Sequence, residues 1–251
     1  MYQFGFIGMG NMGSAMLKGC LSVFPASTLA FSRKDAVKGK ALSLETGAVW
    51  IDSNRACAEQ SRYIILAVKP QFYDGVLKEI QPVLDDSRII ISLAPSYTIA
   101  DLKQALGASV RIVRAMPNTP AMVGEGMTGL SWSEDVFSDT ERQELMQFFT
   151  SFGKAETVPE NLMDAVTAAS GSSPAFIYMM IEALADGVVK YGMPRDKAYT
   201  FVAQAVLGSA KMVLETGEHP GILKDKVCSP GGTTIAAVAA LEASAFRSSL
   251  I

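Results

Sequence analysis

The chain has 251 residues, of which 49% are apolar and 19% charged, with a formal net charge of -3. This composition indicates a globular protein with a sizeable core and argues against nucleic acid or an anionic membrane as the main partner. The 3 scattered cysteines have neither a disulfide nor a metal spacing. The N-terminus lacks the basic segment of a signal peptide, and no apolar run reaches the roughly 20 residues of a membrane span, so we expect a cytoplasmic protein without a metal site.

The opening residues have the layout of a strand, a tight turn and a helix. An apolar run over residues 4–7 leads into Gly8-x-Gly10-x-x-Gly13, and a helix-compatible segment follows over residues 14–21. In dinucleotide-binding folds the first glycine permits the turn, the second lets a pyrophosphate approach the backbone, and the third lets helix pack closely on strand. The free N–H groups of the helix start would then hold the phosphates. Such glycines also occur in ordinary turns, and it is their position directly after a strand that favours a dinucleotide.

Apolar runs and helix-like segments alternate from the start of the chain to about residue 159. Strands are expected at residues 4–7, 28–32, 48–51, 63–68, 88–93, 110–114, 126–132 and 154–158. Helices are expected between them at residues 14–21, 34–45, 54–60, 72–84, 99–106 and 139–152. This alternation predicts an α/β domain over residues 1–159, a Rossmann-like, doubly wound and mostly parallel sheet.

From about residue 160 the pattern becomes purely helical. Apolar residues recur at helical spacing over residues 162–169, 175–191, 194–216 and 233–246, which predicts an all-helical C-terminal domain over residues 160–251. Two stretches, 176–189 and 201–213, are apolar on nearly every side, and a small helical domain cannot cover such surfaces alone. We expect them to pair with another subunit in a homo-oligomer; packing beneath the sheet domain is the alternative.

The end of the second expected strand bears on the choice of dinucleotide. It carries Ser32-Arg33-Lys34, about 20 residues after Gly13, where NAD-preferring domains usually place an acid on the ribose. No acid occurs before Asp35, and arginine accommodates a 2′-phosphate. We therefore predict NADPH, with NADH as the alternative cofactor. Two solvated cations at a helix start are the structural alternative.

Two compact turns follow other expected strands, Ala67-Val68-Lys69-Pro70-Gln71 and Met116-Pro117-Asn118-Thr119-Pro120. Ligands of open parallel sheets lie beyond the carboxyl ends of the strands, so both turns belong on that rim. A proline that merely stops a strand is the alternative for each turn.

A glycine- and threonine-rich loop, Ser229-Pro230-Gly231-Gly232-Thr233-Thr234, leads into the last expected helix. Several free N–H groups and two hydroxyls at a helix start are a natural seat for a carboxylate, although a capped helix start is the simpler interpretation. His219, the only histidine, is expected in a solvated loop between helices. No nucleophile elbow is present, and hydride transfer to or from nicotinamide needs neither a nucleophile nor a metal.

Together these patterns resemble the pyrroline-5-carboxylate reductases, the enzymes that make proline. The matches are Gly5-Phe6-Ile7-Gly8-x-Gly10-Asn11-Met12-Gly13, Ala67-Val68-Lys69-Pro70-Gln71, Arg114-x-Met116-Pro117-Asn118-Thr119-Pro120, Gly171-Ser172-x-Pro174-Ala175-Phe176, Leu223-Lys224-Asp225 and Ser229-Pro230-Gly231-Gly232-Thr233-Thr234. The resemblance implies NAD(P)H-dependent reduction of the cyclic imine 1-pyrroline-5-carboxylate to L-proline, the last step of proline biosynthesis. It also implies dimerisation by intertwining of the helical domains, an active site shared between subunits, and dimers that assemble further, up to a decamer. Family members usually continue for a dozen or more residues beyond Ile251, so the last helix is expected to be short or cut.

The resemblance also implies roles for individual residues. The nucleotide loop is expected at Phe6, Ile7, Gly8, Met9, Gly10, Asn11, Met12 and Gly13. Contacts to the adenosine phosphate are expected from Ser32, Arg33 and Asn54, and contacts on the nicotinamide side from Ala67, Val68, Lys69, Pro70, Ala94, Pro117 and Asn118. The substrate is expected on Gly231, Gly232, Thr233 and Thr234, with the catalytic hydroxyl of Thr234 close to the imine nitrogen. Because threonine is a poor acid, Thr234 is expected to orient the substrate, while the proton arrives on the substrate or from water.

Two other functions remain open at this point. A hydroxyacid dehydrogenase would share the glycine motif but would need a lysine after a glycine-rich segment of the helical domain, and Lys190 and Lys211 lack that setting. The other alternative is a non-enzymatic NADPH-sensing module, in which the loop from Ser229 to Thr234 would be a bare helix cap.

Overall fold

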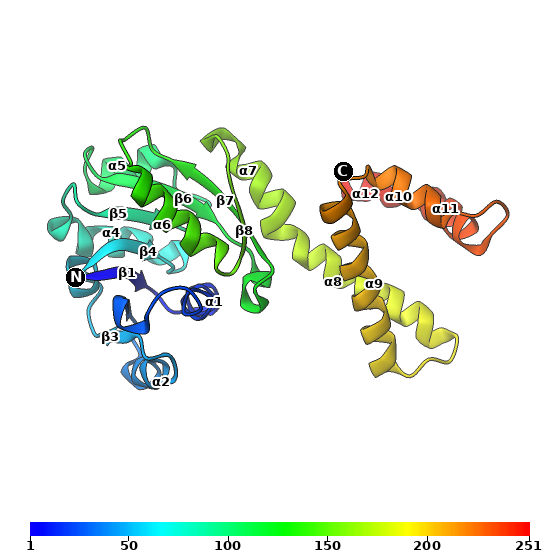
Figure 1. Cartoon of the computed structure of the whole chain (residues 1–251), viewed down its shortest axis with the longest axis horizontal. Coiled ribbons are helices and arrows are strands. Elements are labelled where there is room, and N and C mark those ends of the chain that lie inside the picture. Colours follow the sequence, from blue (N-terminus) through cyan, green and yellow to red (C-terminus); the bar gives the residue numbers. More distant parts are fainter. The chain divides into compact units, whose positions relative to one another are not determined.

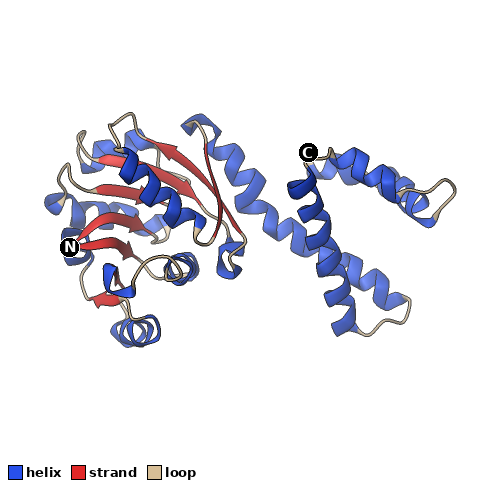
Figure 2. Ribbon diagram, in the orientation of Figure 1, coloured by secondary structure: helices blue, strands red, loops and turns tan.

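The computed structural model describes all 251 residues. The chain divides into two compact units, Met1–Phe176 and Ile177–Ile251 (Figure 1). The first unit is built on a β-sheet and the second consists of helices (Figure 2). None of the helices combines the length and the apolar character that crossing a bilayer would require.

The first unit contains one sheet of 8 strands in the order β3-β2-β1-β4-β5-β6-β7-β8. The strands are β1 Tyr2–Ile7, β2 Leu29–Ser32, β3 Val49–Ile51, β4 Ser61–Leu66, β5 Ile89–Ser92, β6 Arg111–Met116, β7 Gly126–Trp132 and β8 Gly153–Thr157. Neighbouring strands are parallel except at the β6–β7 pair, which is antiparallel. The predicted doubly wound, mostly parallel sheet is thus confirmed.

Helices cover both faces of this sheet. They are α1 Asn11–Cys20, α2 Ala36–Thr46, α3 Asn54–Glu59, α4 Tyr73–Ile80, α5 Ile99–Leu106, α6 Asp139–Thr150 and α7 Met163–Val166. One buried apolar cluster includes residues of α1 and α6, and a second includes residues of α3, α4 and α5 on the other face (Figures 1 and 2). The central strands are therefore buried on both faces, which explains their continuous apolar runs.

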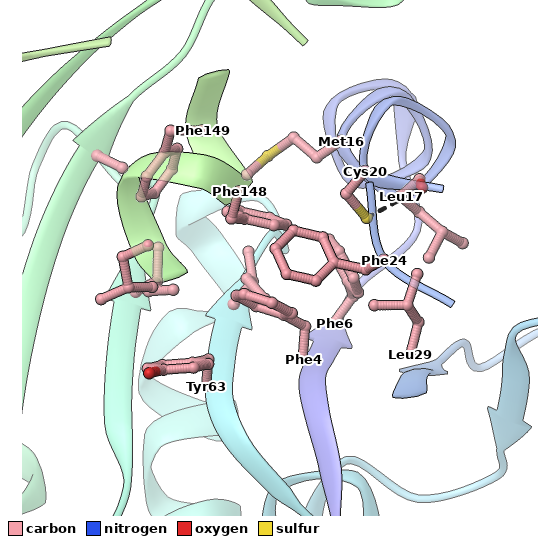
Figure 3. Close-up of a cluster of buried hydrophobic side chains, with 14 of the residues drawn as sticks. Phe4, Phe6, Met16, Leu17, Cys20, Phe24, Leu29, Tyr63, Phe148 and Phe149 are labelled. Carbon is pink, nitrogen blue, oxygen red and sulfur yellow. Dashed lines mark hydrogen bonds between the residues drawn. The ribbon is translucent and has the colours of Figure 1, made fainter. Parts of the chain in front are cut away.

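Aromatic packing fixes β1 in the middle of the sheet (Figure 3). The ring of Phe4 stacks on Phe148 of α6 and on Tyr63 of β4, with centroid separations of 4.4 and 4.9 Å. Phe24 meets the same ring edge-on at 5.0 Å. Offset and edge-on pairs of this kind each add about 0.5–1.5 kcal/mol beyond the burial of apolar area. The strand that leads into the glycine motif is consequently one of the most firmly held parts of the unit.

Beyond β8 the backbone is continuously helical from α7 through a π-helical stretch, Thr167–Ser172, into α8, Ser173–Lys190. Pro174 lies in the first turn of α8, and the residues before it are already helical. Val166 packs against Gly129 of β7 so closely that a Cβ at Gly129 would lie 2.6 Å from it. Such contacts tie residues 160–176 to the first unit, whereas the predicted division falls after residue 159.

The second unit is all-helical, as predicted. Its helices are the remainder of α8, α9 Arg195–Thr216, α10 Pro220–Val227, α11 Thr233–Ala243 and α12 Phe246–Leu250. Helix α10 was not predicted from the sequence. His219 is exposed between α9 and α10, as expected of a solvated residue between helices. His219 is the N-cap of α10: its Nδ1 atom accepts a hydrogen bond from the N–H of Gly221 at 3.1 Å, and Pro220 takes the first helical position.

Most of the apolar surface of the second unit is not covered within one chain. Its buried core comprises only Ala185, Ala198 and Val202. Large apolar side chains remain exposed along the helices, among them Tyr178, Met179, Leu184, Phe201, Leu207, Met212 and Leu214. An exposed apolar surface of this extent is typical of a subunit interface.

Candidate active site

The carboxyl ends of β1, β2, β4, β5 and β6 lie at one edge of the sheet, because these strands are mutually parallel. The glycine motif follows β1 at this edge. Gly8 has a φ of +96°, and a Cβ there would lie 2.8 Å from the backbone nitrogen of Val68. At Gly13 a Cβ would lie 2.4 Å from the carbonyl oxygen of Gly8. At Gly10, by contrast, no atom lies within 4 Å of the Cβ position. The outer two glycines are therefore needed by the fold itself, whereas Gly10 leaves open space.

The start of α1 can bind an anion. Gly10 is the N-cap residue, and no side chain caps the helix. The first N–H groups of a helix have no partner within it and carry the positive end of the helix dipole. Uncapped N–H groups beside the open space at Gly10 are the geometry in which a pyrophosphate binds.

A hollow of about 330 Å³ adjoins this helix start. It is lined by Met9, Gly10, Asn11, Ser14, Ala15, Lys18, Arg33 and Met122. The structure thus brings the predicted Arg33 together with the glycine motif. It also adds Lys18, which sequence reasoning missed because a lysine on a helix usually faces solvent; its Nζ lies 2.5 Å from Oε1 of Glu45.

The acid nearest to Arg33 is engaged elsewhere. Oδ1 of Asp35 accepts the N–H of Lys38 at 3.1 Å as the N-cap of α2. This hydrogen bond lowers the pKa of Asp35, so the carboxylate stays charged at its cap position. No acid therefore stands at the end of β2 in the place where a ribose would need one.

Ser32 and Asn54, the other residues expected at the adenosine phosphate, are bonded to each other. The hydroxyl of Ser32 donates to Oδ1 of Asn54 at 2.7 Å, and Nδ2 of Asn54 donates to Oε2 of Glu79 at 2.8 Å. Only 2% of Ser32 is exposed. In this structure the pair therefore joins β2 to α3.

A second hollow, of about 190 Å³, lies at the same edge. It is lined by Met12, Ala67, Val68, Leu93, Met116 and Pro117. Four of these, Met12, Ala67, Val68 and Pro117, are residues that the sequence predicts at the cofactor. Lys69 and Pro70 follow in the exposed turn after β4.

Several predicted contacts have buried side chains. Phe6 and Ile7 are fully buried in β1, one on each face of the sheet, and Ala94 is 5% exposed. Their side chains belong to the apolar core, so only their backbone groups are available to a ligand. Asn118 is 8% exposed, and its carboxamide bonds to two backbone groups of the chain.

Two buried polar networks that the sequence did not predict hold the loops of this edge. The hydroxyl of Tyr73 donates to the carbonyl of Leu66 at 2.8 Å and accepts the N–H of Leu93 at 3.1 Å, joining the ends of β4 and β5. Burial raises the pKa of Tyr73 to about 12, so this hydroxyl keeps its proton at neutral pH.

The second network centres on Arg114 of β6, which is 5% exposed. Its guanidinium pairs with Oε1 of Glu160 at 2.7 Å and donates to the carbonyl of Pro95 at 2.9 Å. The same glutamate oxygen accepts the N–H of Ile99 at 2.7 Å. The loop after β5, which contains Ala94, is thus fixed by a charged pair beneath it. In the sequence, the only indication of this network is that Arg114, a charged residue, ends the expected strand at residues 110–114.

The predicted substrate loop belongs to the second unit. Gly231 has a φ of +68°, which favours glycine, and Gly232 is the N-cap of α11. No side chain caps this helix either. The loop therefore presents uncapped N–H groups beside the hydroxyls of Thr233 and Thr234, an arrangement that suits a carboxylate.

Comparison with known proteins agrees with this geometry. A family model for pyrroline-5-carboxylate reductase dimerisation matches residues 160–251, and one for coenzyme F420-dependent NADP oxidoreductases matches residues 3–96. Pyrroline-5-carboxylate reductase of Escherichia coli (strain K12) is 45% identical over 252 residues, which cover 99% of this chain and 93% of that protein. The Methanosarcina acetivorans protein of the same name is 39% identical, with the same coverage of 99% and 93%.

Solved structures match over the whole chain as well. The Plasmodium falciparum pyrroline carboxylate reductase with NADP bound superposes with a TM-score of 0.88 at 32% identity, covering 99% of this chain and 92% of that one. The enzyme from Coxiella burnetii gives a TM-score of 0.90 at 32% identity, with 99% and 93% covered. With relatives of this identity along its full length, the chain belongs to the pyrroline-5-carboxylate reductase family.

Proposed function

We propose that this protein reduces 1-pyrroline-5-carboxylate to L-proline with NADPH, the last step of proline biosynthesis. The observation that carries the proposal is a second uncapped helix start, at Gly232, in a chain whose first helix start already suits a pyrophosphate. Family membership over the full chain supports it. The lack of a lysine after a glycine-rich segment of the helical region counts against a hydroxyacid dehydrogenase.

The residues at the carboxyl ends of the parallel strands fit NADP. Open space above Gly10 and uncapped N–H groups at α1 suit the pyrophosphate, and the cations Arg33 and Lys18 in the adjoining hollow suit a 2′-phosphate. When bound, the nicotinamide supplies the hydride. We assign the adenosine end to Arg33 and the nicotinamide end to the hollow lined by Ala67, Val68 and Pro117.

The substrate is assigned to the loop before α11. The N–H groups of Thr233 and Thr234 hold the substrate carboxylate, because that of Gly232 already donates to the carbonyl of Ser229 at 3.0 Å. The Thr234 hydroxyl hydrogen-bonds to the ring nitrogen. An imine carbon accepts hydride more readily when its nitrogen is protonated. Because an alcohol is a weak acid, we assign Thr234 the task of orienting the ring; the proton is already on the nitrogen or comes from water. Addition of one hydride to carbon and one proton to nitrogen completes the reduction.

The experiment follows NADPH absorbance with pyrroline-5-carboxylate as substrate and, separately, with a keto acid. Oxidation with the imine alone supports the proposal. Oxidation with the keto acid alone would favour the dehydrogenase, and no oxidation with either would favour a sensing module. Thr234→Ala should lower kcat at least about tenfold while the dissociation constant of NADPH stays unchanged, and Thr234→Ser is the matched control because it keeps the hydroxyl. Unchanged turnover in Thr234→Ala would remove this residue from the mechanism.

The cofactor assignment has its own test. Arg33→Ala should raise the Michaelis constant for NADPH by about tenfold and leave that for NADH nearly unaltered, because only NADPH carries the 2′-phosphate. Equal effects on both cofactors would contradict the assignment. Lys18→Ala is the companion variant, since it removes the other cation of the same hollow.

We further propose that residues 160–251 form the dimerisation and substrate domain, that dimers assemble up to a decamer, and that the enzyme works in the cytoplasm. The family model over residues 160–251 and the exposed apolar side chains of α8 and α9 support homo-oligomerisation. Sedimentation equilibrium should give an even number of chains, and a monomer at micromolar concentration would refute the dimer.

A further inference from the structure

Two segments of the first unit that resemble family motifs lie against each other. One is the turn after β6 that contains Met116, Pro117 and Asn118. The other is the end of the π-helical stretch. Pro117 of the first is assigned to the nicotinamide above, whereas Asn118 and the whole second segment have no role in that proposal. Nδ2 of Asn118 donates a hydrogen bond to the backbone carbonyl of Ser170 at 3.0 Å. A side chain at the sheet edge is thereby joined to the backbone of a helix 52 residues later in the chain.

Pro174 explains why that carbonyl is available. In an α-helix the carbonyl of Ser170 would accept the N–H of the residue four positions later, and a proline has no N–H to give. The π-helical stretch Thr167–Ser172 directly precedes this proline. Inserted π turns of this kind are frequent at functional sites. Asn118 supplies a donor to this carbonyl in place of the N–H that Pro174 lacks.

The other half of the carboxamide is engaged as well. Oδ1 of Asn118 accepts the N–H of Met127, in β7, at 2.8 Å. Its backbone carbonyl accepts the N–H of Ala121 at 3.2 Å. With 8% of the residue exposed, Asn118 is a buried link between the turn, the sheet and the helix.

Steric contact reinforces the link. A Cβ at Gly171 would lie 2.6 Å from Cε of Met116, so the side chain of Met116 lies directly on the helix at a residue that has no side chain of its own. Met116 and Pro117 in turn line the 190 Å³ hollow together with Ala67 and Val68. One wall of this hollow is therefore set by the contact with Ser170 and Gly171.

We propose that Asn118 is a positioning residue for hydride transfer. Through its bonds to Ser170 and Met127 it fixes the Met116–Pro117 wall against which the nicotinamide ring is placed; this inference rests on the proposed function. Asn118 acts on the ring through the wall, because both ends of its carboxamide are bonded to backbone groups. A wall that moves would misplace the ring while the adenosine half, held at Arg33 and α1, would bind as before.

The test compares the affinity of the protein for NADPH with its affinity for 2′,5′-ADP, which contains only the adenosine half of the cofactor. Asn118→Asp keeps the acceptor for Met127 and loses the donor to Ser170. We expect kcat to fall at least about tenfold, NADPH affinity to fall by about the same factor, and 2′,5′-ADP affinity to stay within about twofold of wild type. A variant with unchanged kcat and unchanged NADPH affinity would overturn the proposal, as would equal losses for NADPH and 2′,5′-ADP.

Gly171→Ala gives a second approach that leaves Asn118 intact. The new methyl group displaces the flexible end of Met116, so the unit should still fold, and the ratio of NADPH to 2′,5′-ADP affinity should shift in the same direction. Gly75→Ala in α4 is the matched control, because no atom lies within 4 Å of its Cβ position. If Gly171→Ala has the same affinity ratio as Gly75→Ala, the wall does not depend on this contact and the proposal fails.

Failure of the proposed function gives a different result. If the wild-type protein oxidises no NADPH with pyrroline-5-carboxylate, the reductase assignment fails, yet the affinity ratio measured by fluorescence titration still supports or refutes the role of Asn118.

Discussion

Gly10 and Gly13 belong to the same motif, yet alanine should have opposite consequences at the two positions. A Cβ at Gly13 would lie 2.4 Å from the carbonyl oxygen of Gly8, a backbone atom that cannot move aside without displacing the turn. A Cβ at Gly10 meets no atom within 4 Å. We therefore expect Gly13→Ala to affect folding, and Gly10→Ala to affect only the binding of the cofactor.

The magnitudes follow from general rules. Forcing an extra methyl group into a packed contact costs about 1–3 kcal/mol, which in a chain of this length lowers the melting temperature by roughly 2–12 °C. A cofactor at about 100 times its dissociation constant stabilises the folded state by about 2.7 kcal/mol. If Gly10→Ala weakens binding about tenfold, about 1.4 kcal/mol of that stabilisation is lost, or roughly 3–6 °C.

Differential scanning fluorimetry with and without NADPH measures both quantities. In the absence of NADPH, Gly10→Ala should have the same melting temperature as the wild type. In the presence of NADPH, its melting temperature should rise by less than that of the wild type. Gly13→Ala should have a lower melting temperature than the wild type under both conditions. The reasoning is refuted if Gly10→Ala lowers the melting temperature of the free protein as much as Gly13→Ala does, or if NADPH stabilises Gly10→Ala fully.

Three further predictions concern the buried polar groups of the first unit. Glu160→Gln should lower the free energy of unfolding in urea by about 3 kcal/mol, because it leaves the charge of Arg114 buried and unpaired. Arg114→Met should lower this free energy by less, since water can reach the remaining carboxylate. Equal losses of unfolding free energy in the two variants would contradict this. Burial acts to raise the pKa of Glu141, but hydrogen bonds at the start of α6 and a neighbouring arginine outweigh it and keep the pKa below 4.5. Its stabilisation is therefore present above that pH and lost as the pH falls through the lowered pKa, and Glu141→Gln should flatten the acid side of a plot of urea midpoint against pH. Burial raises the pKa of the Cys20 and Cys57 thiols to about 12, so neither should react with a thiol reagent at about pH 8 until the protein unfolds; modification in the folded state would refute their burial.

Much of the fold follows from local pattern. The sequence predicts helix 99–106 and strand 126–132 at the bounds that the structure has. The helix begins at a capping box formed by Thr98 and Asp101, so its start is marked by residue type. Strand β4 begins two residues earlier than expected, at Ser61, because this small polar residue is buried beside Gly5 of the neighbouring strand. Only the tertiary contact makes Ser61 a strand residue.

The candidate site is predictable to a similar degree. The glycine motif, Arg33 and the two proline turns gather at one sheet edge because parallel strands end together. The bonds that hold this edge were not predictable. Asn118, Arg114 and Tyr73 all bond to backbone carbonyls or N–H groups of distant segments, and a backbone group has no signature in the sequence. Helix α10 was missed for a related reason, since its cap is the ring nitrogen of His219 rather than a serine or aspartate oxygen.

The stacking of Phe4 on Phe148 also bears on the order in which the molecule forms (Figure 3). β1 leaves the ribosome first, but its two neighbours in the sheet are β2 and β4, and the ring that covers it comes from α6, more than half the chain later. Contacts so distant in sequence form slowly, since the intervening loop must close first. The glycine turn is thus synthesised before every other part of the site, yet it reaches its final shape only after α6 has been translated. A pause in translation before α6 would leave β1, the apolar strand that leads into the glycine turn, exposed to chaperones and to aggregation.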